Sequence, residues 1–118
     1  MENVYTFKVI YNDDKIEMRR IFPTKQIFVK RIREQFRNDD RIACIMVFGS
    51  AVSIKCNKWS DIDLLVRLKD NAVSNSNKNE ISECIQELCD WNADIIWFDR
   101  IDKKDRIYNE ILKGVQIV

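Results

Sequence analysis

The chain has 118 residues, 46% of them hydrophobic, and a formal net charge of +1 at pH 7. This length and apolar content favour a single globular domain with a core of its own. Acidic and basic residues nearly balance, so bulk charge does not indicate nucleic-acid binding, and no run approaches the ~20 apolar residues that span a bilayer. Residues 1–4 lack the basic region and apolar core of a signal peptide, so we expect a cytoplasmic protein.

Residues 1–24 are predicted to form an N-terminal β-hairpin. Apolar and polar residues alternate over 5–9, turn-forming residues follow at 12–14, and the alternation resumes from 16 to 22. The hairpin could extend a sheet or form an interface. We place the main domain at residues 25–118.

A helix and a buried strand are expected next. Pro23-Thr24 is a helix-start signal, and apolar residues then recur at helical spacing up to Phe36. Residues 42–48 form a continuous apolar run, which is typical of a central strand buried on both faces.

The dipeptide Gly49-Ser50 ends that strand in a predicted tight turn. Glycine permits a positive φ and close approach of a phosphate group. Ser50 could cap a short following helix, whose free N–H groups would face an anion, or donate its hydroxyl to a phosphate oxygen. Lys55 and Lys58 follow in an irregular segment and could reach phosphate oxygens or be ordinary loop lysines.

Two carboxylates stand on the next predicted strand, residues 61–68. Alternate residues of a strand share a face, so Asp61 and Asp63 should lie together, with Cα atoms about 6.6 Å apart. Such a pair suits two metal ions, and hard oxygen ligands favour Mg²⁺ or Mn²⁺. The chain has no histidine, which further disfavours zinc. The plainer interpretation is a turn followed by an exposed strand face.

The remaining elements are a polar loop over 69–79, a helix capped by Asn79, a strand over 93–98 and a last helix from Asp102 to Gly114. Asp94 begins the strand, where burial is costly unless a cation or partner is present, although an acid facing water is the alternative. Trp91 and Trp97 are expected to pack against other side chains rather than to stack on bases. The four cysteines have no metal-ligand spacing and are interpreted as reduced thiols, with Cys56 in a loop. The alternating strands and helices predict an α+β (mixed α/β) fold, a small mixed sheet backed by helices.

The pattern of Gly49-Ser50, ten residues, then Asp61-Ile62-Asp63 resembles the signature of the minimal nucleotidyltransferases (MNT) of the DNA polymerase β superfamily. Ser60 stands before the first acid, as in that family, and Asp94 fits the place of its third carboxylate. The resemblance covers about residues 25–118. The chain departs from the family just after Ser50, where residues 51–54 replace a basic residue and a further glycine.

The resemblance implies transfer of a nucleoside monophosphate, AMP from ATP by default, to a hydroxyl group. It implies that Asp61, Asp63 and Asp94 are catalytic and bind two Mg²⁺ ions, with Gly49, Ser50 and Ser60 at the nucleotide. Similar small proteins are antitoxins that adenylylate a helical HEPN ribonuclease toxin, so a protein acceptor is expected. The alternatives are an oligomeric small-molecule nucleotidyltransferase of the antibiotic-modifying type, and a non-catalytic protein that neutralises its partner by contact.

Overall fold

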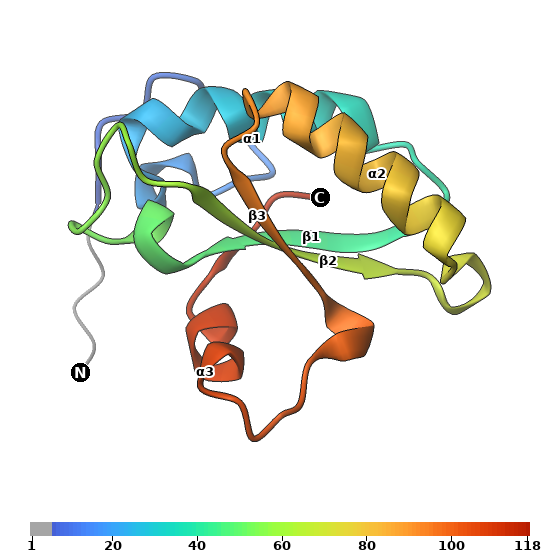
Figure 1. Ribbon diagram of the computed structural model, residues 1–118. Coiled ribbons are helices and arrows are strands. Elements are labelled where there is room, and N and C mark those ends of the chain that lie inside the picture. The colour runs from blue at the N-terminus through green and yellow to red at the C-terminus, as the bar shows by residue number, and fades with distance from the viewer. Residues whose placement is uncertain (1–5) are drawn as a thin grey trace.

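A four-stranded mixed sheet organises the chain, and the computed structural model describes residues 6–118. The strand order is β3-β2-β1-β4, with β2 parallel to β3 and antiparallel to β1, which in turn is antiparallel to β4. Two helices cover one face and a shorter helix lies against the other (Figure 1). The elements are α1 (Gln26–Phe36), β1 (Ile42–Phe48), β2 (Ile62–Leu68), α2 (Asn75–Leu88), β3 (Ala93–Trp97), α3 (Arg106–Leu112) and β4 (Val115–Gln116).

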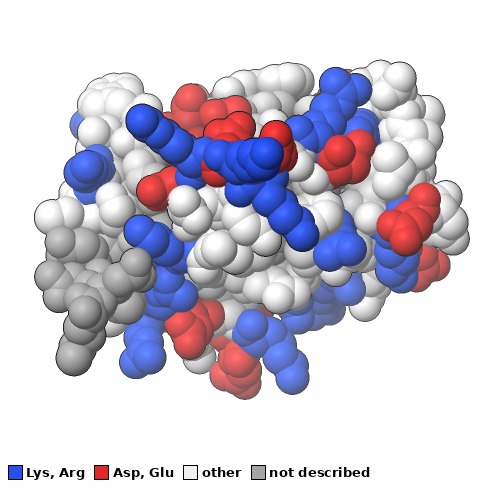
Figure 2. All heavy atoms as spheres, turned by 90° about the horizontal axis from the view of Figure 1, so that it is seen from below, with Lys and Arg blue, Asp and Glu red and all other residues white. Residues whose placement is uncertain are grey.

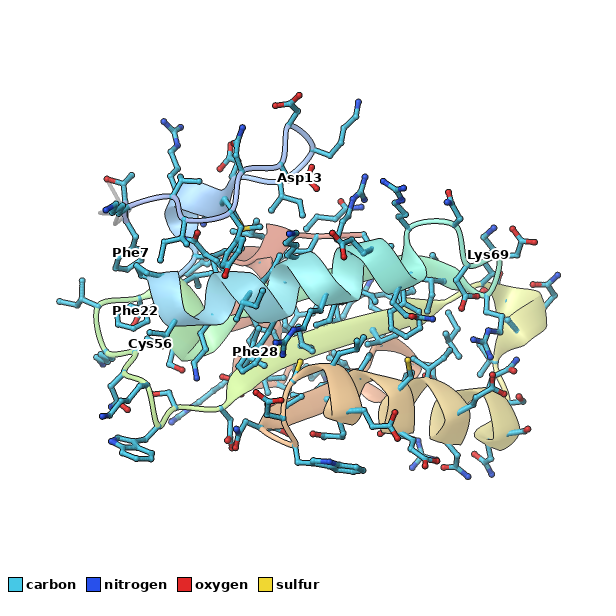
Figure 3. The ribbon with its side chains drawn as sticks, turned by 90° about the horizontal axis from the view of Figure 1, so that it is seen from above. Phe7, Asp13, Phe22, Phe28, Cys56 and Lys69 are labelled. Carbon is cyan, nitrogen blue, oxygen red and sulfur yellow. The ribbon has the colours of Figure 1, made fainter. Side chains whose placement is uncertain are left out.

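The larger core lies between the sheet and the two helices α1 and α2, which run side by side over it (Figure 3). Alternate residues of β2 point into this core, as the sequence predicts, and so do the apolar residues of α1 at helical spacing. The fully buried members from these elements include Val29, Ile32, Ile62, Leu64 and Val66. The mixed α+β architecture is therefore confirmed.

A smaller core lies on the opposite face of the sheet, beneath α3. Phe48, Leu65 and Ile111 are its buried members, and Ile96 and Phe98 pack against them. Along β2, the side chains that point away from the larger core face the side of the sheet that carries α3. Asp63 is one of them.

The predicted N-terminal hairpin is wrong for the part that the structure describes, because residues 6–22 form no strand. The chain does turn at residues 14–15, and Phe7 N donates to Arg19 O at 2.6 Å. In place of a strand ladder, the buried Gln26 side chain accepts from Ile10 N at 2.8 Å and donates to Lys8 O at 2.8 Å. The other half of this prediction, residues 1–5, lies outside the described residues.

Several helix boundaries differ from the prediction. Helix α2 begins at Asn75 rather than near Asn79, because the Ser74 hydroxyl accepts from Asn77 N at 3.1 Å and caps it. Helix α3 is capped by Asp105 instead of Asp102. Strand β4 was not predicted. Within residues 6–118, no helix is long and apolar enough to cross a membrane.

Candidate functional site

Asp63 and Asp94 are brought together by strand register. In the parallel pair β2–β3, Asp63 is opposite Asp94, and in the antiparallel pair β1–β2 it is opposite Phe48. Residues 48, 63 and 94 therefore form a row across three strands, and the Gly49-Ser50 turn follows directly after this row. The sequence prediction that Asp94 lies on the side of the sheet that carries Asp63 agrees with this register.

Glycine is needed at position 49 because the turn passes against the Asp63 carboxylate. Gly49 has a φ of +70°, and a Cβ atom there would lie 2.3 Å from Asp63 Oδ2. The next residue, Ser50, directs its backbone N–H to the Asp63 carboxylate. Ser50 lies inside the 3-10 turn Gly49–Val52 and does not cap it, so the predicted capping role is wrong. The turn instead presents the Ser50 backbone N–H toward an acid.

Asp63 is repelled by the charges of Asp94 and Asp61. Burial raises the pKa of its carboxyl group, and the charges of Asp94 and Asp61 raise it further, whereas the Ser50 N–H lowers it. Like charges so placed favour proton uptake or the binding of a cation. The local donor set consists of carboxylate oxygens, which are hard ligands that suit Mg²⁺.

Asp61 lies next to this pair, one residue ahead of β2, and both Asp61 and Asp94 are exposed. The start of β2 is held to the start of β3 by a hydrogen bond from Ile62 N to Asn92 O of 2.9 Å. In residues 6–118, no three His, Cys, Asp or Glu side chains form a group that could hold a metal ion. The three carboxylates are thus neighbours whose side chains are not preassembled as ligands.

The loop before Asp61 is ordered by its own side chains. The Ser60 hydroxyl accepts from Asn57 N at 3.1 Å, so it is engaged within the loop, and nucleotide contact by Ser60 stays a prediction. Cys56 is buried, and burial raises the pKa of its thiol. Lys55 and Lys58 are exposed, and the Lys58 ammonium lies 4.9 Å from the Trp59 ring centroid.

Two exposed tryptophans flank the start of β2. Trp59 is 82% exposed and Trp91 is 66% exposed, so the prediction of a packing role for Trp91 is wrong. Asp90 and Trp91 both have positive φ angles, 52° and 63°, which turn the chain out of α2 and into β3. Large exposed aromatic side chains of this kind are frequent in protein interfaces.

Lys25 is a site-proximal residue that sequence reasoning missed. It precedes α1, is 2% exposed, and donates from Nζ to the carbonyl oxygen of Ser60, directly before Asp61. A lysine at a helix start ordinarily reads as solvated. Its one sequence signal is its position directly after the helix-start signal Pro23-Thr24.

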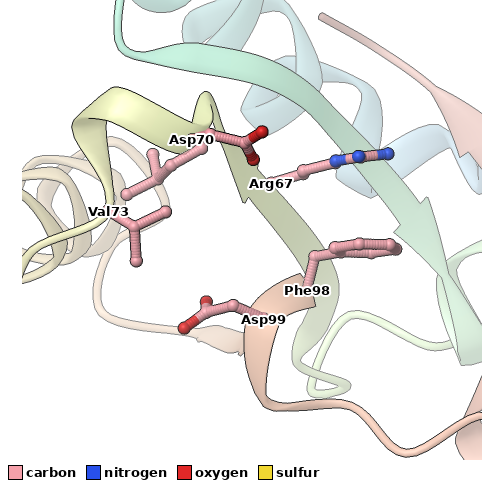
Figure 4. A pocket seen from close by; sticks show the side chains of 6 residues that line it. Arg67, Asp70, Val73, Phe98 and Asp99 are labelled. Atoms are coloured by element: carbon pink, nitrogen blue, oxygen red, sulfur yellow. The ribbon is translucent and has the colours of Figure 1, made fainter.

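A small pocket of about 140 Å³ lies away from the carboxylates, where β2 and β3 end (Figure 4). The Arg67 guanidinium covers the Phe98 ring at 4.4 Å, and Asp99 pairs with Lys78 at 2.6 Å. Arg67 is four residues beyond Asp63, or roughly 13 Å along the strand. The pocket therefore does not belong to the carboxylate site. Basic and acidic side chains are interspersed on the face that carries α3, which shows no continuous basic surface (Figure 2).

A family model described as "Polymerase beta, Nucleotidyltransferase" matches residues 30–118. Among solved structures, a complex of tri-AMPylated Shewanella oneidensis HEPN toxin with MNT antitoxin matches at 21% identity and a TM-score of 0.56, covering 80% of this chain and 71% of that one. The toxin–antitoxin MntA–HepT matches at 20% identity and a TM-score of 0.55, covering 79% and 71%. At such identities the likeness is one of fold. No curated protein matches the sequence.

Proposed function

The chain belongs to the polymerase β nucleotidyltransferase family, and from that premise we propose that it transfers AMP from ATP to a hydroxyl group on a partner protein. The observation that carries the proposal is the register of Asp63 with Asp94, beside a turn whose glycine cannot be replaced without displacing Asp63. Burial, and then the charges of Asp94 and Asp61, raise the pKa of Asp63, and a divalent cation would neutralise this concentration of negative charge.

The carboxylates fit a magnesium site by chemistry, since they offer only hard oxygen donors. We assign Asp61 and Asp63 to hold two Mg²⁺ ions and Asp94 to complete the shell of one of them. Bound Mg²⁺ would supply positive charge to the triphosphate and lower the pKa of the acceptor hydroxyl. Gly49 and Ser50 would hold the β- and γ-phosphates: the glycine lets a phosphate approach the backbone closely, and the Ser50 hydroxyl can donate to a phosphate oxygen.

In the proposed reaction, Asp94 accepts the proton of the acceptor hydroxyl. The hydroxyl oxygen then bonds to the α-phosphorus of ATP. The bond from that phosphorus to the bridging oxygen of the β-phosphate breaks, and its electron pair leaves with pyrophosphate. Positioning and charge neutralisation dominate such a transfer, so little else is asked of the protein. Ser60 would contribute by ordering the loop before Asp61.

A protein acceptor of the HEPN type, modified on a tyrosine, is favoured by two observations. The chain shares its fold with structures titled as complexes of HEPN toxins with MNT antitoxins. Trp59, two residues before Asp61, and Trp91, three residues before Asp94, are both exposed, which suits docking of a macromolecule better than enclosure of a small acceptor.

The direct test uses ATP labelled at the α-phosphate, Mg²⁺, the full chain, and the protein that co-purifies with it from its native cells. We expect label on a tyrosine of the partner, located by mass spectrometry. Asp63→Asn and Asp94→Asn should each slow transfer at least about a hundredfold, because each removes charge from the site. Asp40→Asn, at an exposed acid after α1, is the matched control and should transfer normally.

Two outcomes would contradict the proposal. If ATP binds but label never reaches the partner, the chain is not a protein adenylyltransferase, and a stable unlabelled complex would indicate neutralisation by contact. If Asp63→Asn transfers as fast as the wild-type chain, the carboxylates are not the reactive site.

A further inference from the structure

The segment 22–25 contacts both halves of the candidate site. Phe22 N donates to Ala51 O at 2.7 Å, which ties the segment to the turn that contains Gly49 and Ser50. Three residues later, Lys25 Nζ donates to the carbonyl oxygen of Ser60. This short stretch thus joins the turn to the loop that leads into Asp61.

Lys25 occupies an environment that is unusual for a lysine. It is 2% exposed, and within the described chain its ammonium is held by the neutral Ser60 carbonyl and lies 5.7 Å from the Phe28 ring centroid. Phe22 and Cys56 lie close together at the start of α1, and Phe28 lies further along that helix (Figure 3). Burying a charge without an opposite charge is costly, so stability alone would favour an apolar residue at this position.

The surroundings of Cys56 place Lys25 close behind the carboxylates. Burial raises the pKa of the Cys56 thiol, the Lys25 and Ser60 side chains lower it, and the Asp63 charge raises it. These groups therefore lie within electrostatic range of one buried sulfur atom. The Ser60 carbonyl belongs to the planar peptide group that joins Ser60 to Asp61, so a donor fixed on that oxygen restricts the backbone from which the Asp61 side chain departs.

We propose that Lys25 is a positioning residue that fixes the backbone at Asp61, and with it the approach of Asp61 to Asp63, by holding the Ser60 carbonyl. This inference rests on the proposed cation site. Lys25 lies ahead of residues 30–118, which the family model matches, so the family comparison does not assign it. Its role resembles that of outer groups that orient metal ligands, whose loss typically weakens metal binding roughly 10- to 100-fold.

The test measures Mn²⁺ binding to the full chain, without nucleotide, by electron paramagnetic resonance or calorimetry. Lys25→Met keeps an apolar side chain of similar length and removes the donor, and it should bind Mn²⁺ about tenfold more weakly. Lys25→Arg keeps a donor and should restore affinity to within about threefold of the wild-type value. Lys30→Met is the control, since Lys30 lies on α1 and contacts Glu34 and Tyr11 instead.

A double-variant cycle shows whether Lys25 acts through Asp61. The double variant Lys25→Met, Asp61→Asn should bind Mn²⁺ as strongly as the single variant Asp61→Asn. Once the Asp61 ligand is lost, the residue that positions it has nothing left to contribute. If the double variant weakens Mn²⁺ binding by the product of the two single-variant factors, the proposal is overturned. A folded Lys25→Met variant that binds Mn²⁺ as the wild type does would overturn it as well.

Mn²⁺ binding by the wild-type chain and folding of the variants distinguish the proposed cation site from the proposed role of Lys25. If the wild-type chain binds no Mn²⁺, the cation site of the proposed function fails, and the role of Lys25 fails with it. If the wild-type chain binds and Lys25→Met does too, only the role of Lys25 fails. Should Lys25→Met not fold, Lys25→Arg decides, and a tenfold loss in this folded donor-bearing variant would contradict the proposal.

Discussion

Replacing Gly49 by alanine should damage both stability and cation binding, because two separate penalties meet at this position. The first is conformational: Gly49 has a φ of +70°, where an L-residue costs about 1–2 kcal/mol. The second is steric: the added Cβ would lie 2.3 Å from Asp63 Oδ2 and 3.2 Å from Asp63 Cγ. Moving that carboxylate off its rotamer costs about 0.5–1.5 kcal/mol more.

Together these penalties predict a loss of about 1.5–3.5 kcal/mol in the free energy of unfolding, or a melting temperature lowered by about 6–14 °C for a domain of this size. Urea unfolding and calorimetry in a chelating buffer measure both. In an Asp63→Ala background the carboxylate is gone, so Gly49→Ala should cost only the conformational part, about 1–2 kcal/mol.

Gly114→Ala is the matched control. Its Cβ would lie 2.5 Å from Val47 O, so it should also destabilise the fold, but it does not contact Asp63. The folded Gly49→Ala chain should bind Mn²⁺ at least about tenfold more weakly, whereas the folded Gly114→Ala chain should bind it normally. An equal cost of Gly49→Ala with and without the Asp63 carboxylate would refute the steric part, and a cost below about 0.5 kcal/mol would refute both parts.

Three further predictions concern charge and buried polar groups. Because the pKa of Asp63 is raised in the folded chain, its contribution to stability is present below its ordinary pKa of 3.8 and is lost as pH rises through the raised value. Without divalent cations, the Asp63→Asn variant should therefore resist urea better than the wild type at about pH 7 and lose that advantage at about pH 3. The Arg41 guanidinium, 2.8 Å from Asp39 Oδ2, lowers the pKa of Asp39, so this contribution is present above pH 3.8 and is lost as pH falls through the lowered value; Asp39→Asn should cost about 1 kcal/mol near pH 7, and a cost that persists in acid would contradict this. Gln26→Leu leaves several backbone groups unpaired and should cost about 2–3 kcal/mol by urea unfolding, with faster amide exchange in residues 8–21, whereas the exposed Gln35→Leu on the same helix should cost little.

The face of β2 that carries Asp63 could be predicted because strand alternation is a local rule. The apolar positions of residues 61–68 define one face, so Asp63 had to point to the other. The parallel register that sets Asp63 opposite Asp94 depends on how α2 returns the chain, which local pattern does not encode. Family resemblance supplied that step before the structure did.

The N-terminal segment could not be predicted for a physical reason. Alternation over 5–9 and 16–22 is shared by true strands and by extended chain that packs one side on a core. The structure uses one buried side chain, Gln26, to satisfy backbone groups that a ladder would otherwise pair. A glutamine in the first turn of a helix ordinarily indicates exposure, and the lysine before it does too, so neither burial was foreseen.

The outward turn of Trp91 has a similar origin. Tryptophan near an apolar strand is usually packed, but the two positive φ angles at residues 90 and 91 rotate this side chain away from the core. Positive φ at bulky residues is uncommon and is not signalled by hydropathy. Exposure at this position is thus a property of the connection between α2 and β3.

Strand β2 also protects the chain against errors during folding. Its even-numbered residues from 62 to 68 are all buried beneath α1 and α2, while position 63 carries a charge and position 67 another. If β2 shifted by one residue against β1, every side chain of β2 would move to the other face of the sheet. Both charges would then enter the hydrophobic core beneath α1 and α2 without partners. The charged groups at positions 63 and 67 therefore oppose misalignment of this strand, and variants that neutralise them should populate misaligned sheets more often.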